Sequence, residues 1–202
     1  MLAKVVIATH NPAKKTRYGR LLKDLAKEVI SLADLDISEK PYESGQTAEE
    51  NAEIKACYYA NLTRLPAFSI DEAIYLNHLP PEKQPGIACR RIEGKEEASD
   101  DELLAYWEAV VASLPPDKRT GYWHTAYCLA TPDGKMQTTA VNIPIMFFSP
   151  SSKIRIPGWP MSSLEGPVGF QKPHSEMTEE EHQKHNKEID RLIIEKLKVF
   201  GV

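Results

Sequence analysis

The chain has 202 residues, of which 27% are charged, and a net charge of −4 at pH 7. This balance argues against non-specific binding to nucleic acid or an anionic membrane, and no apolar run approaches the roughly 18 residues of a membrane span. Three scattered cysteines, Cys57, Cys89 and Cys128, form neither a disulfide framework nor a C-x-x-C metal motif. The start MLAKVVIA lacks the pattern of a signal peptide, so we expect a cytoplasmic protein.

The first elements alternate between strand and helix. A short apolar run at 4–8 predicts a buried strand, and the spacing of apolar residues over 12–29 predicts a helix with Pro12 in its first turn. A second strand is predicted over 29–35, and a polar loop over 36–46. The residues expected on the buried side of the helix are Tyr18, Leu21, Leu22 and Leu25.

A second helix is predicted to begin at Thr47, because Thr47 and Glu50 form a capping-box pattern. The run 65–70 predicts the next strand, which we expect to end at Asp71 and Glu72. The apolar stripe expected on the helix consists of Ile54, Cys57, Tyr58 and Leu62.

The second half continues the alternation after a proline-rich loop at 79–86. Acidic residues in the first turn favour a helix over 99–114. A β-hairpin is predicted over 122–143, followed by a strand or strand end at 143–149. The stretch 150–173 is dense in Ser, Pro and Gly and predicts a long loop.

A last helix is predicted from Thr178 to the C-terminus. The order of strands and helices predicts one α/β layered domain over 1–202. The residues of the last helix expected to face inward are Ile189, Leu192, Ile193 and Leu197.

The turn THNPAKK after the first strand has the chemistry of a phosphate site. In α/β sheets ligands bind where strands end, and the free N–H groups of a helix start favour anions. Thr9 and Asn11 supply neutral polar groups, and Lys14 or Lys15 supplies a cation. The turn matches neither the P-loop nor the Rossmann pattern, and the alternative is a capped turn with two solvated lysines.

Two pairs of acids suggest a metal site beside this turn. Glu49 and Glu50 lie at a helix start, and Asp71 and Glu72 at a strand end. If the two ends face each other, their carboxylates and phosphate oxygens would suit Mg²⁺. The alternative is that the paired acids form solvated faces or complement a helix dipole.

Several motifs together resemble the inosine-triphosphate pyrophosphatase family. The turn at 9–14 looks like that family's T/S-x-N-x-x-K turn, and 50–56 looks like its E-N-A-x-x-K-A helix. The strand at 65–74 occupies the place of L-P-x-x-A-D-D-S-G-L, and 85–91 resembles P-G-x-x-S-A-R-Y. The order and spacing agree over nearly the whole chain.

The resemblance implies a long twisted mixed sheet flanked by helices, two lobes with a central cleft, and a homodimer. It also implies Mg²⁺-dependent hydrolysis of inosine, xanthosine and related triphosphates to monophosphate and pyrophosphate. Asp71 would orient water or bind metal, and Glu50 would bind metal. The residues that would hold the triphosphate are Thr9, Asn11, Lys14 and Lys55.

The chain departs from the family pattern at several functional positions. Ile70 replaces the first aspartate of the D-D pair, and Glu72 is expected to restore the lost carboxylate as a metal ligand. Arg17 replaces a glutamate. The base-pocket segment is reduced to Pro-Gly-Trp-Pro, so that Trp159 would contact substrate, and Glu188 falls where an arginine would read the base.

These features lead to three hypotheses. The first is a Mg²⁺-dependent nucleoside-triphosphate pyrophosphatase with altered base recognition. The second is a catalytically impaired nucleotide-binding protein, which Ile70 and Glu188 favour. The third is a partner-binding domain that exposes the stretch IPIMFF at 143–148, although such a stretch is more often core. His182 and His185 lie near Glu188 in the sequence and could contribute to reading the base, but they are interpreted as surface histidines on a solvated helix face.

Overall fold

The computed structural model describes residues 1–92, 94–95 and 97–197, and these divide into two compact units. Unit 1 contains residues 1–72, 125–141 and those from 187 onward, and unit 2 contains 73–124 and 142–186. A six-stranded sheet has the order β2-β1-β3-β4-β5-β6. The predicted mixed sheet with flanking helices is thereby confirmed, whereas the single domain with two lobes around a cleft stays a prediction.

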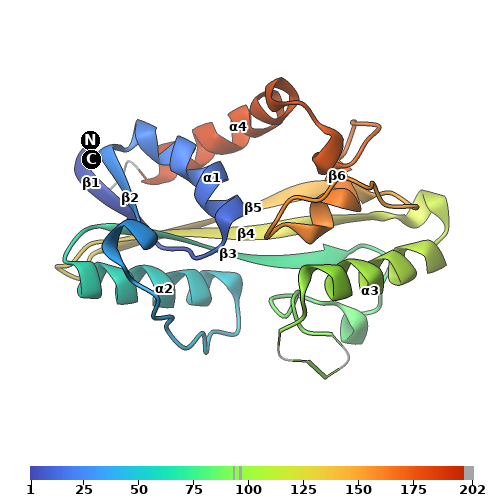
Figure 1. Cartoon of the computed structure of the whole chain (residues 1–202), viewed down its shortest axis with the longest axis horizontal. Coiled ribbons are helices and arrows are strands. Elements are labelled where there is room, and N and C mark those ends of the chain that lie inside the picture. The colour runs from blue at the N-terminus through green and yellow to red at the C-terminus, as the bar shows by residue number, and fades with distance from the viewer. Residues whose placement is uncertain (93, 96, 198–202) are drawn as a thin grey trace. The chain divides into compact units, whose positions relative to one another are not determined.

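Unit 1 is built around parallel strands. β1 (Leu2–Ile7) pairs in parallel with β2 (Ala26–Ser31) and with β3 (Ala67–Leu76). In Figure 1, α1 (Pro12–Leu21) lies on one side of these strands and α2 (Ala48–Thr63) lies on the other. The core between the strands and α1 includes Val5, Ile7, Tyr18, Leu21, Phe68 and Tyr127.

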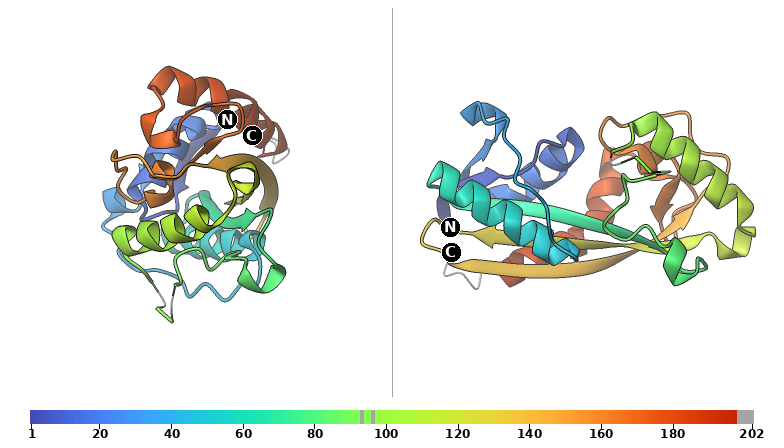
Figure 2. Two further views of the ribbon diagram at one scale, coloured as in Figure 1. Left: turned by 90° about the vertical axis from the view of Figure 1, so that its right-hand side faces the viewer. Right: turned by 90° about the horizontal axis from the view of Figure 1, so that it is seen from below.

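Unit 2 has its own core. It contains α3 (Asp100–Ser113) and β6 (Glu165–Pro167), and β6 pairs antiparallel with β5 (Met136–Phe147). Figure 2 shows α3 from two further sides. β4 (Thr120–Ala130) and α4 (Glu179–Leu197) contribute residues to both units. The core of unit 2 includes Ile74, Leu76, Leu104, Trp107, Phe147 and Leu164.

Three element boundaries differ from those predicted. The helix predicted over 12–29 ends at Leu21, and a 3₁₀ turn at Leu22–Asp24 leads into β2, because pairing with β1 overrides the helical spacing. The strand predicted over 29–35 is therefore β2, and a 3₁₀ turn follows at Ala33–Leu35. β3 does not end at Asp71 but continues through buried Ala73, Ile74 and Leu76.

The prediction for the stretch 143–149 also changes in the structure. Residues 136–147 form the single strand β5, in which Ile145 and Phe147 are buried and Met146 between them faces the other way. Alternation along a strand, not a continuous exposed patch, therefore describes IPIMFF. The predicted loop at 150–173 contains the short strand β6 and a 3₁₀ turn at Pro160–Ser163.

The apolar stripe predicted for α2 is wrong. Leu62 is 49% exposed and Tyr58 is 36% exposed, while the buried face carries small residues and one aromatic ring. Small side chains let a helix approach a sheet closely, so volume rather than hydrophobicity marks this face. The buried residues of α2 are Ala48, Asn51, Ala52, Ala56, Tyr59 and Ala60.

The last helix matches its predicted start. Thr178 Oγ1 accepts from the Glu181 N–H at 3.3 Å, and Glu181 Oε2 accepts from the Thr178 N–H at 2.7 Å. Ile193 and Leu197 are buried as expected, but Leu192 is 39% exposed. The predicted end beyond 197 lies outside the described residues.

No α-helix in the described ranges combines the length and apolar character needed to cross a lipid bilayer.

Candidate active site

The turn after β1 is fixed by its own polar side chains. Thr9 Oγ1 accepts from the Asn11 N–H at 3.1 Å. Asn11 is the N-cap of α1, and its Oδ1 accepts from the N–H groups of Ala13 at 2.9 Å and Lys14 at 3.1 Å. The local sequence thus explains the turn, since asparagine is among the best N-cap residues and proline suits the first helical turn.

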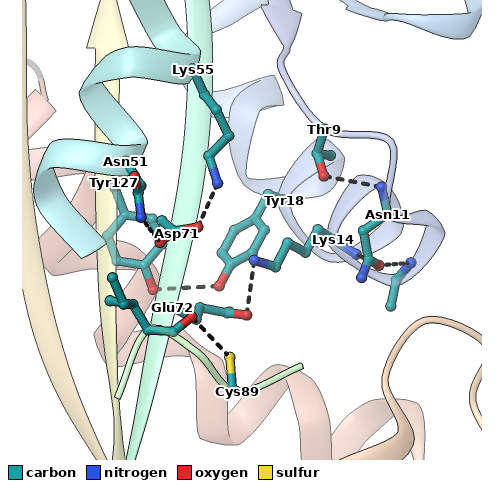
Figure 3. A network of polar contacts seen from close by, with 12 residues as sticks. Thr9, Asn11, Lys14, Tyr18, Asn51, Lys55, Asp71, Glu72, Cys89 and Tyr127 are labelled. Atoms are coloured by element: carbon teal, nitrogen blue, oxygen red, sulfur yellow. Dashed lines mark hydrogen bonds and ion pairs between the residues drawn. The ribbon is translucent and has the colours of Figure 1, made fainter. Parts of the chain in front are cut away.

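Lys14 reaches from this turn to β3, as Figure 3 shows. Its Nζ lies 3.0 Å from Glu72 Oε2, and both side chains are about three-quarters buried. Glu72 lies close enough to Tyr18 and Tyr127 for its charge to help raise the pKa of both phenols, after the larger effect of burial. The phenols of Tyr18 and Tyr127 therefore stay neutral near the Lys14–Glu72 ion pair.

Lys55 of α2 makes a second ion pair with β3 (Figure 3). Its Nζ lies 2.5 Å from Asp71 Oδ1, and each side chain is 13% exposed. Asn51, one helical turn earlier, points its amide at Asp71 Oδ2 at 3.5 Å. Lys55 also contacts Glu43 Oε2 at 3.1 Å, from the loop before α2.

Successive residues of a strand point to opposite faces of its sheet. Asp71 pairs with Lys55 of α2, whereas Glu72 pairs with Lys14 of α1. The two helices lie on opposite sides of the strands in Figure 1. The structure therefore joins four predicted site residues in two ion pairs with adjacent positions of β3, Lys14 with Glu72 and Lys55 with Asp71. The turn that Thr9 and Asn11 form leads directly to Lys14.

Glu50 has a different surrounding from the one predicted. Its Oε2 accepts from the Gln46 N–H at 2.6 Å, so its carboxylate closes the first turn of α2. Thr47 Oγ1 accepts from the Glu50 N–H at 3.2 Å, which completes the cap that the sequence predicts.

Glu43 is a site residue that the sequence interpretation missed. It lies in an irregular loop, where no periodicity identifies inward-facing residues, and its side chain is 42% exposed. The available signal was an acidic side chain in a polar loop just before the helix that carries Lys55.

Glu43 and Asp71 provide a donor set that suits Mg²⁺. Among the residues that the structure describes, no group of three or more His, Cys, Asp or Glu side chains is arranged to hold a metal by itself. Mg²⁺ commonly uses only one or two protein carboxylates, with phosphate oxygens and water as the other ligands. The two carboxylates that contact Lys55 fit that requirement. The predicted metal ligands were Glu50, Asp71 and Glu72, so Glu43 is an addition to that set.

Trp159 lies in unit 2, within a cluster of rings. Its ring centroid is 4.8 Å from that of His174 and 6.4 Å from that of His182. The rings of His174 and His182 are nearly parallel, with centroids 5.9 Å apart. His182 and His185 are half-buried, so their interpretation as surface histidines is wrong.

A buried ion pair supports this ring cluster. His174 Nδ1 lies 3.0 Å from Glu165 Oε2, and the Glu165 side chain is fully buried. Burial alone would lower the pKa of His174, but the charge of Glu165 and its hydrogen bonds together raise the pKa above the usual value. The raised pKa therefore favours the imidazolium form of His174 beside the Trp159 ring.

The remaining departures from the family pattern lie in other surroundings. Ile70 is 1% exposed and belongs to the core of unit 1. Arg17 forms an ion pair with Asp190 of α4, and its guanidinium carbon lies 5.1 Å from the Tyr18 ring centroid. Glu188 is exposed on α4, where Arg191 contacts it at 3.0 Å.

Comparison with protein families gives a match to a model described as the Ham1 family over residues 5–143. A dITP/XTP pyrophosphatase from a Bradyrhizobium species is 34% identical over 146 residues, 69% of this chain and 65% of that protein. A dITP/XTP pyrophosphatase from Rhodopseudomonas palustris is 36% identical over 66% of this chain and 63% of that protein. The matched segments thus span slightly less than two thirds of these relatives. A dITP/XTP pyrophosphatase from Brucella melitensis is 31% identical over 88% of this chain and 81% of its own length.

Solved structures give the same result for the fold. The Ham1 protein from Staphylococcus aureus superposes with a TM-score of 0.73 at 18% identity, and covers 98% of both chains. A HAM1 protein from Coxiella burnetii has a TM-score of 0.69 at 21% identity, over 96% of this chain and all of its own.

Proposed function

Because the chain belongs to the Ham1 family, we propose that it hydrolyses a nucleoside triphosphate to a monophosphate and pyrophosphate. The observation that carries the proposal is that two largely buried lysines form ion pairs with adjacent carboxylates of β3, Lys14 of α1 with Glu72 and Lys55 of α2 with Asp71. Two partly desolvated cations beside carboxylates are suited to an anionic substrate and the metal ion that accompanies it. The names of the relatives support the substrate class, which is dITP or XTP in each of them.

In this proposal Lys14 and Lys55 bind phosphate oxygens. Thr9 and Asn11 are proposed as further substrate-binding residues, and their hydrogen bonds fix the turn that carries Lys14. Both lysines must exchange part of their carboxylate contacts for phosphate oxygens. Catalysis then rests on positioning and on stabilising developing negative charge, as in other phosphoryl transfers.

Asp71 is the residue proposed to orient the attacking water. It is held from two sides, by the Lys55 ammonium and the Asn51 amide, so its carboxylate has a defined direction. The water attacks phosphorus, and pyrophosphate leaves. A carboxylate has two acceptor oxygens. Asp71 can therefore orient water with one oxygen and contribute the other to a metal site.

Mg²⁺ is part of the proposal. When bound, it would neutralise the negative charge that develops on the phosphate oxygens. Asp71 and Glu43 are the residues proposed to hold it, with Glu72 and Glu50 as the further carboxylates that the sequence suggested. Glu50 would have to release the Gln46 N–H to take part.

Altered recognition of the base is also proposed. Trp159 offers an aromatic face that lies against the rings of His174 and His182. The buried ion pair with Glu165 holds the His174 ring in this position. Glu188, by contrast, is paired with Arg191 on the exposed surface of α4. The ring cluster therefore supports a contact of Trp159 with the base, and a set of reading groups unlike the family pattern.

The proposal is tested by changing the water-orienting carboxylate. Asp71→Asn keeps the shape of the side chain but loses its charge, and we expect turnover to fall at least a hundredfold while nucleotide still binds. Pyrophosphate release measures turnover, and calorimetry measures binding. Asp24→Asn is the matched control, because Asp24 is exposed on the 3₁₀ turn after α1. Near-normal turnover of Asp71→Asn would rule out the role of Asp71.

The substrate class is tested by a screen of nucleoside triphosphates with Mg²⁺. We expect that the protein hydrolyses a non-canonical nucleoside triphosphate and that inosine triphosphate is not its preferred substrate. A clear preference for inosine triphosphate would contradict altered base recognition but leave the hydrolase proposal standing. Cytoplasmic location and a homodimer complete the proposal, and sedimentation of the purified chain tests the dimer.

A second candidate is a nucleotide-binding protein without catalysis. Ile70, which is buried in the core, stands where the family pattern has a carboxylate. Binding of the triphosphate with no hydrolysis product in chromatography would select this candidate.

A further inference from the structure

The loop before α2 is held along one stripe of that helix. Asn51, Lys55 and Tyr59 are spaced four residues apart, so they lie on the same face of α2. The Tyr59 hydroxyl donates to the Glu39 carbonyl at 2.8 Å, and Lys55 donates to Glu43 at 3.1 Å. At the other end, Asn51 Oδ1 accepts from the Gly45 N–H at 2.8 Å.

These contacts give the segment 39–45 a fixed register on the helix. Its residues meet α2 in reverse order, from Tyr59 at one end to Asn51 at the other. Gly45 is needed for this approach, because a Cβ at that position would lie 2.6 Å from Asn51 Oδ1. Glu43 lies between the two fixed ends, so its carboxylate reaches Lys55 only in this register.

His10 joins the segment to the phosphate turn. Its Nε2 lies 3.2 Å from the Glu39 carbonyl and 3.1 Å from the Tyr59 hydroxyl oxygen. A carbonyl only accepts, and the Tyr59 proton is given to Glu39, so Nε2 carries a proton and donates to both oxygens. Thr9 and Asn11, the neighbours of His10, form the turn described above.

We propose that the segment 39–45, here called the strap, positions Glu43 for the metal and phosphate site, and that Tyr59 and His10 are its positioning residues. This inference rests on the proposed function, because Glu43 matters only if a metal-bound phosphate occupies the site. Tyr59 is 2% exposed and does not face a ligand, so it acts through the Glu39 carbonyl. Burial is the main reason that the pKa of Tyr59 is raised to about 12, so the hydroxyl keeps its proton at neutral pH and remains a donor.

The decisive variant is Tyr59→Phe, which removes one hydroxyl and leaves the ring in place. Loss of a neutral hydrogen bond corresponds to a change of about two- to tenfold in the position of the strap equilibrium. We expect the Mg²⁺ concentration for half-maximal activity to rise by about that factor, with kcat at saturating Mg²⁺ unchanged. Tyr58→Phe is the matched control, because Tyr58 is the next residue and is 36% exposed.

A second readout does not depend on activity. Tyr42 lies in the strap and is 87% exposed, so chymotrypsin can attack the chain after it once the strap leaves α2. Cleavage after Tyr42, followed by mass spectrometry without nucleotide or metal, should be about two- to tenfold faster in Tyr59→Phe than in the wild type or in Tyr58→Phe. Gly45→Ala should accelerate the same cleavage, because the added Cβ pushes the strap away from Asn51.

The outcomes separate the strap from the proposed function. Unchanged cleavage and unchanged Mg²⁺ dependence in Tyr59→Phe would overturn the strap proposal. Loss of thermal stability in Tyr59→Phe with unchanged Mg²⁺ dependence would also overturn it, since Tyr59 would then be only a core residue. If the wild type hydrolyses no nucleoside triphosphate, the proposed function fails, whereas faster cleavage in Tyr59→Phe would still support the strap register.

Discussion

Lys14 and Lys15 are neighbours of the same residue type, but they lie in different surroundings. Lys14 is largely buried and pairs with Glu72, whereas Lys15 is exposed. A buried ammonium has lost much of its hydration, so it gains more from a phosphate than an exposed one does. Two residues that the sequence could not rank are therefore distinguished by the structure.

This difference leads to a prediction for the two lysines. Lys14→Gln should raise the KM for the nucleoside triphosphate by about 10- to 100-fold, the range expected when a hydrogen bond to a charged group is lost. Lys15→Gln should change KM by less than about threefold, because an exposed charge is screened by solvent. Steady-state kinetics at saturating Mg²⁺ measure both values, and equal effects of the two substitutions would refute the assignment of Lys14.

At the scale of elements, two helices begin with the same kind of cap in different units. In α3, Ser99 Oγ accepts from the Glu102 N–H at 3.3 Å, and Glu102 accepts from the Ser99 N–H at 3.0 Å. In α2, the corresponding acceptor is Thr47, and the first turn also carries Asn51, which holds the strap. The cap of α2 therefore supports both stability and the candidate site, whereas the cap of α3 lies in the other unit.

We expect this contrast to separate stability from activity. Ser99→Ala and Thr47→Ala should each lower the free energy of unfolding by about 1 kcal/mol. Only Thr47→Ala should also raise the Mg²⁺ requirement, because it loosens the turn that carries Asn51. Denaturant unfolding and Mg²⁺ titration of activity measure the two effects, and a normal Mg²⁺ requirement in Thr47→Ala would contradict the link between cap and strap.

The elements also show how far the sequence could predict this fold. Caps at Thr47 and Thr178 have local signatures, and the structure confirms both of them. The acids that predicted the helix over 99–114 lie in the first turn of α3, which Ser99 caps. The predicted end of the first helix is wrong, because residues 26–31 pair with β1. That contact joins distant segments, which no local sequence window contains. The prediction of the buried face of α2 is wrong for a related reason. Alanine gives a weak hydrophobic signal, although the close packing at this face requires small residues.

The candidate site, like the fold, could be predicted only where its signals are local in the sequence. The turn at Thr9–Lys14 could be found because strand, cap and lysine are consecutive in the sequence. Glu43 could not, because its inward direction is set by contacts of the strap with α2.

At the scale of the whole molecule, stability depends on pH through the pair Glu165 and His174. The pKa of His174 is raised in the folded protein above the value of 6.5 that applies to the unfolded chain. A raised folded-state pKa contributes stability that is complete below pH 6.5 and is lost as the pH rises through the folded-state pKa. Deprotonation also leaves the fully buried Glu165 carboxylate without its cation.

The wild type should therefore lose free energy of unfolding as the pH rises above about 6.5 and through the folded-state pKa of His174, with a slope from this pair no steeper than about 1.4 kcal/mol per pH unit. Glu165→Gln keeps a hydrogen-bond acceptor but removes the charge, so this part of the pH dependence should vanish. Urea unfolding at several pH values measures the difference between the two proteins. A difference that grows as the pH falls below 6.5 would have the opposite sign to this account.

The adjacent positions 71 and 72 of β3 direct their carboxylates to different helices, α2 and α1. A substitution at one of them changes a single lysine's counter-charge, and leaves the partner of the other lysine where it was. An evolving lineage can consequently retune its two cationic contacts one mutation at a time, without passing through an intermediate in which both are lost.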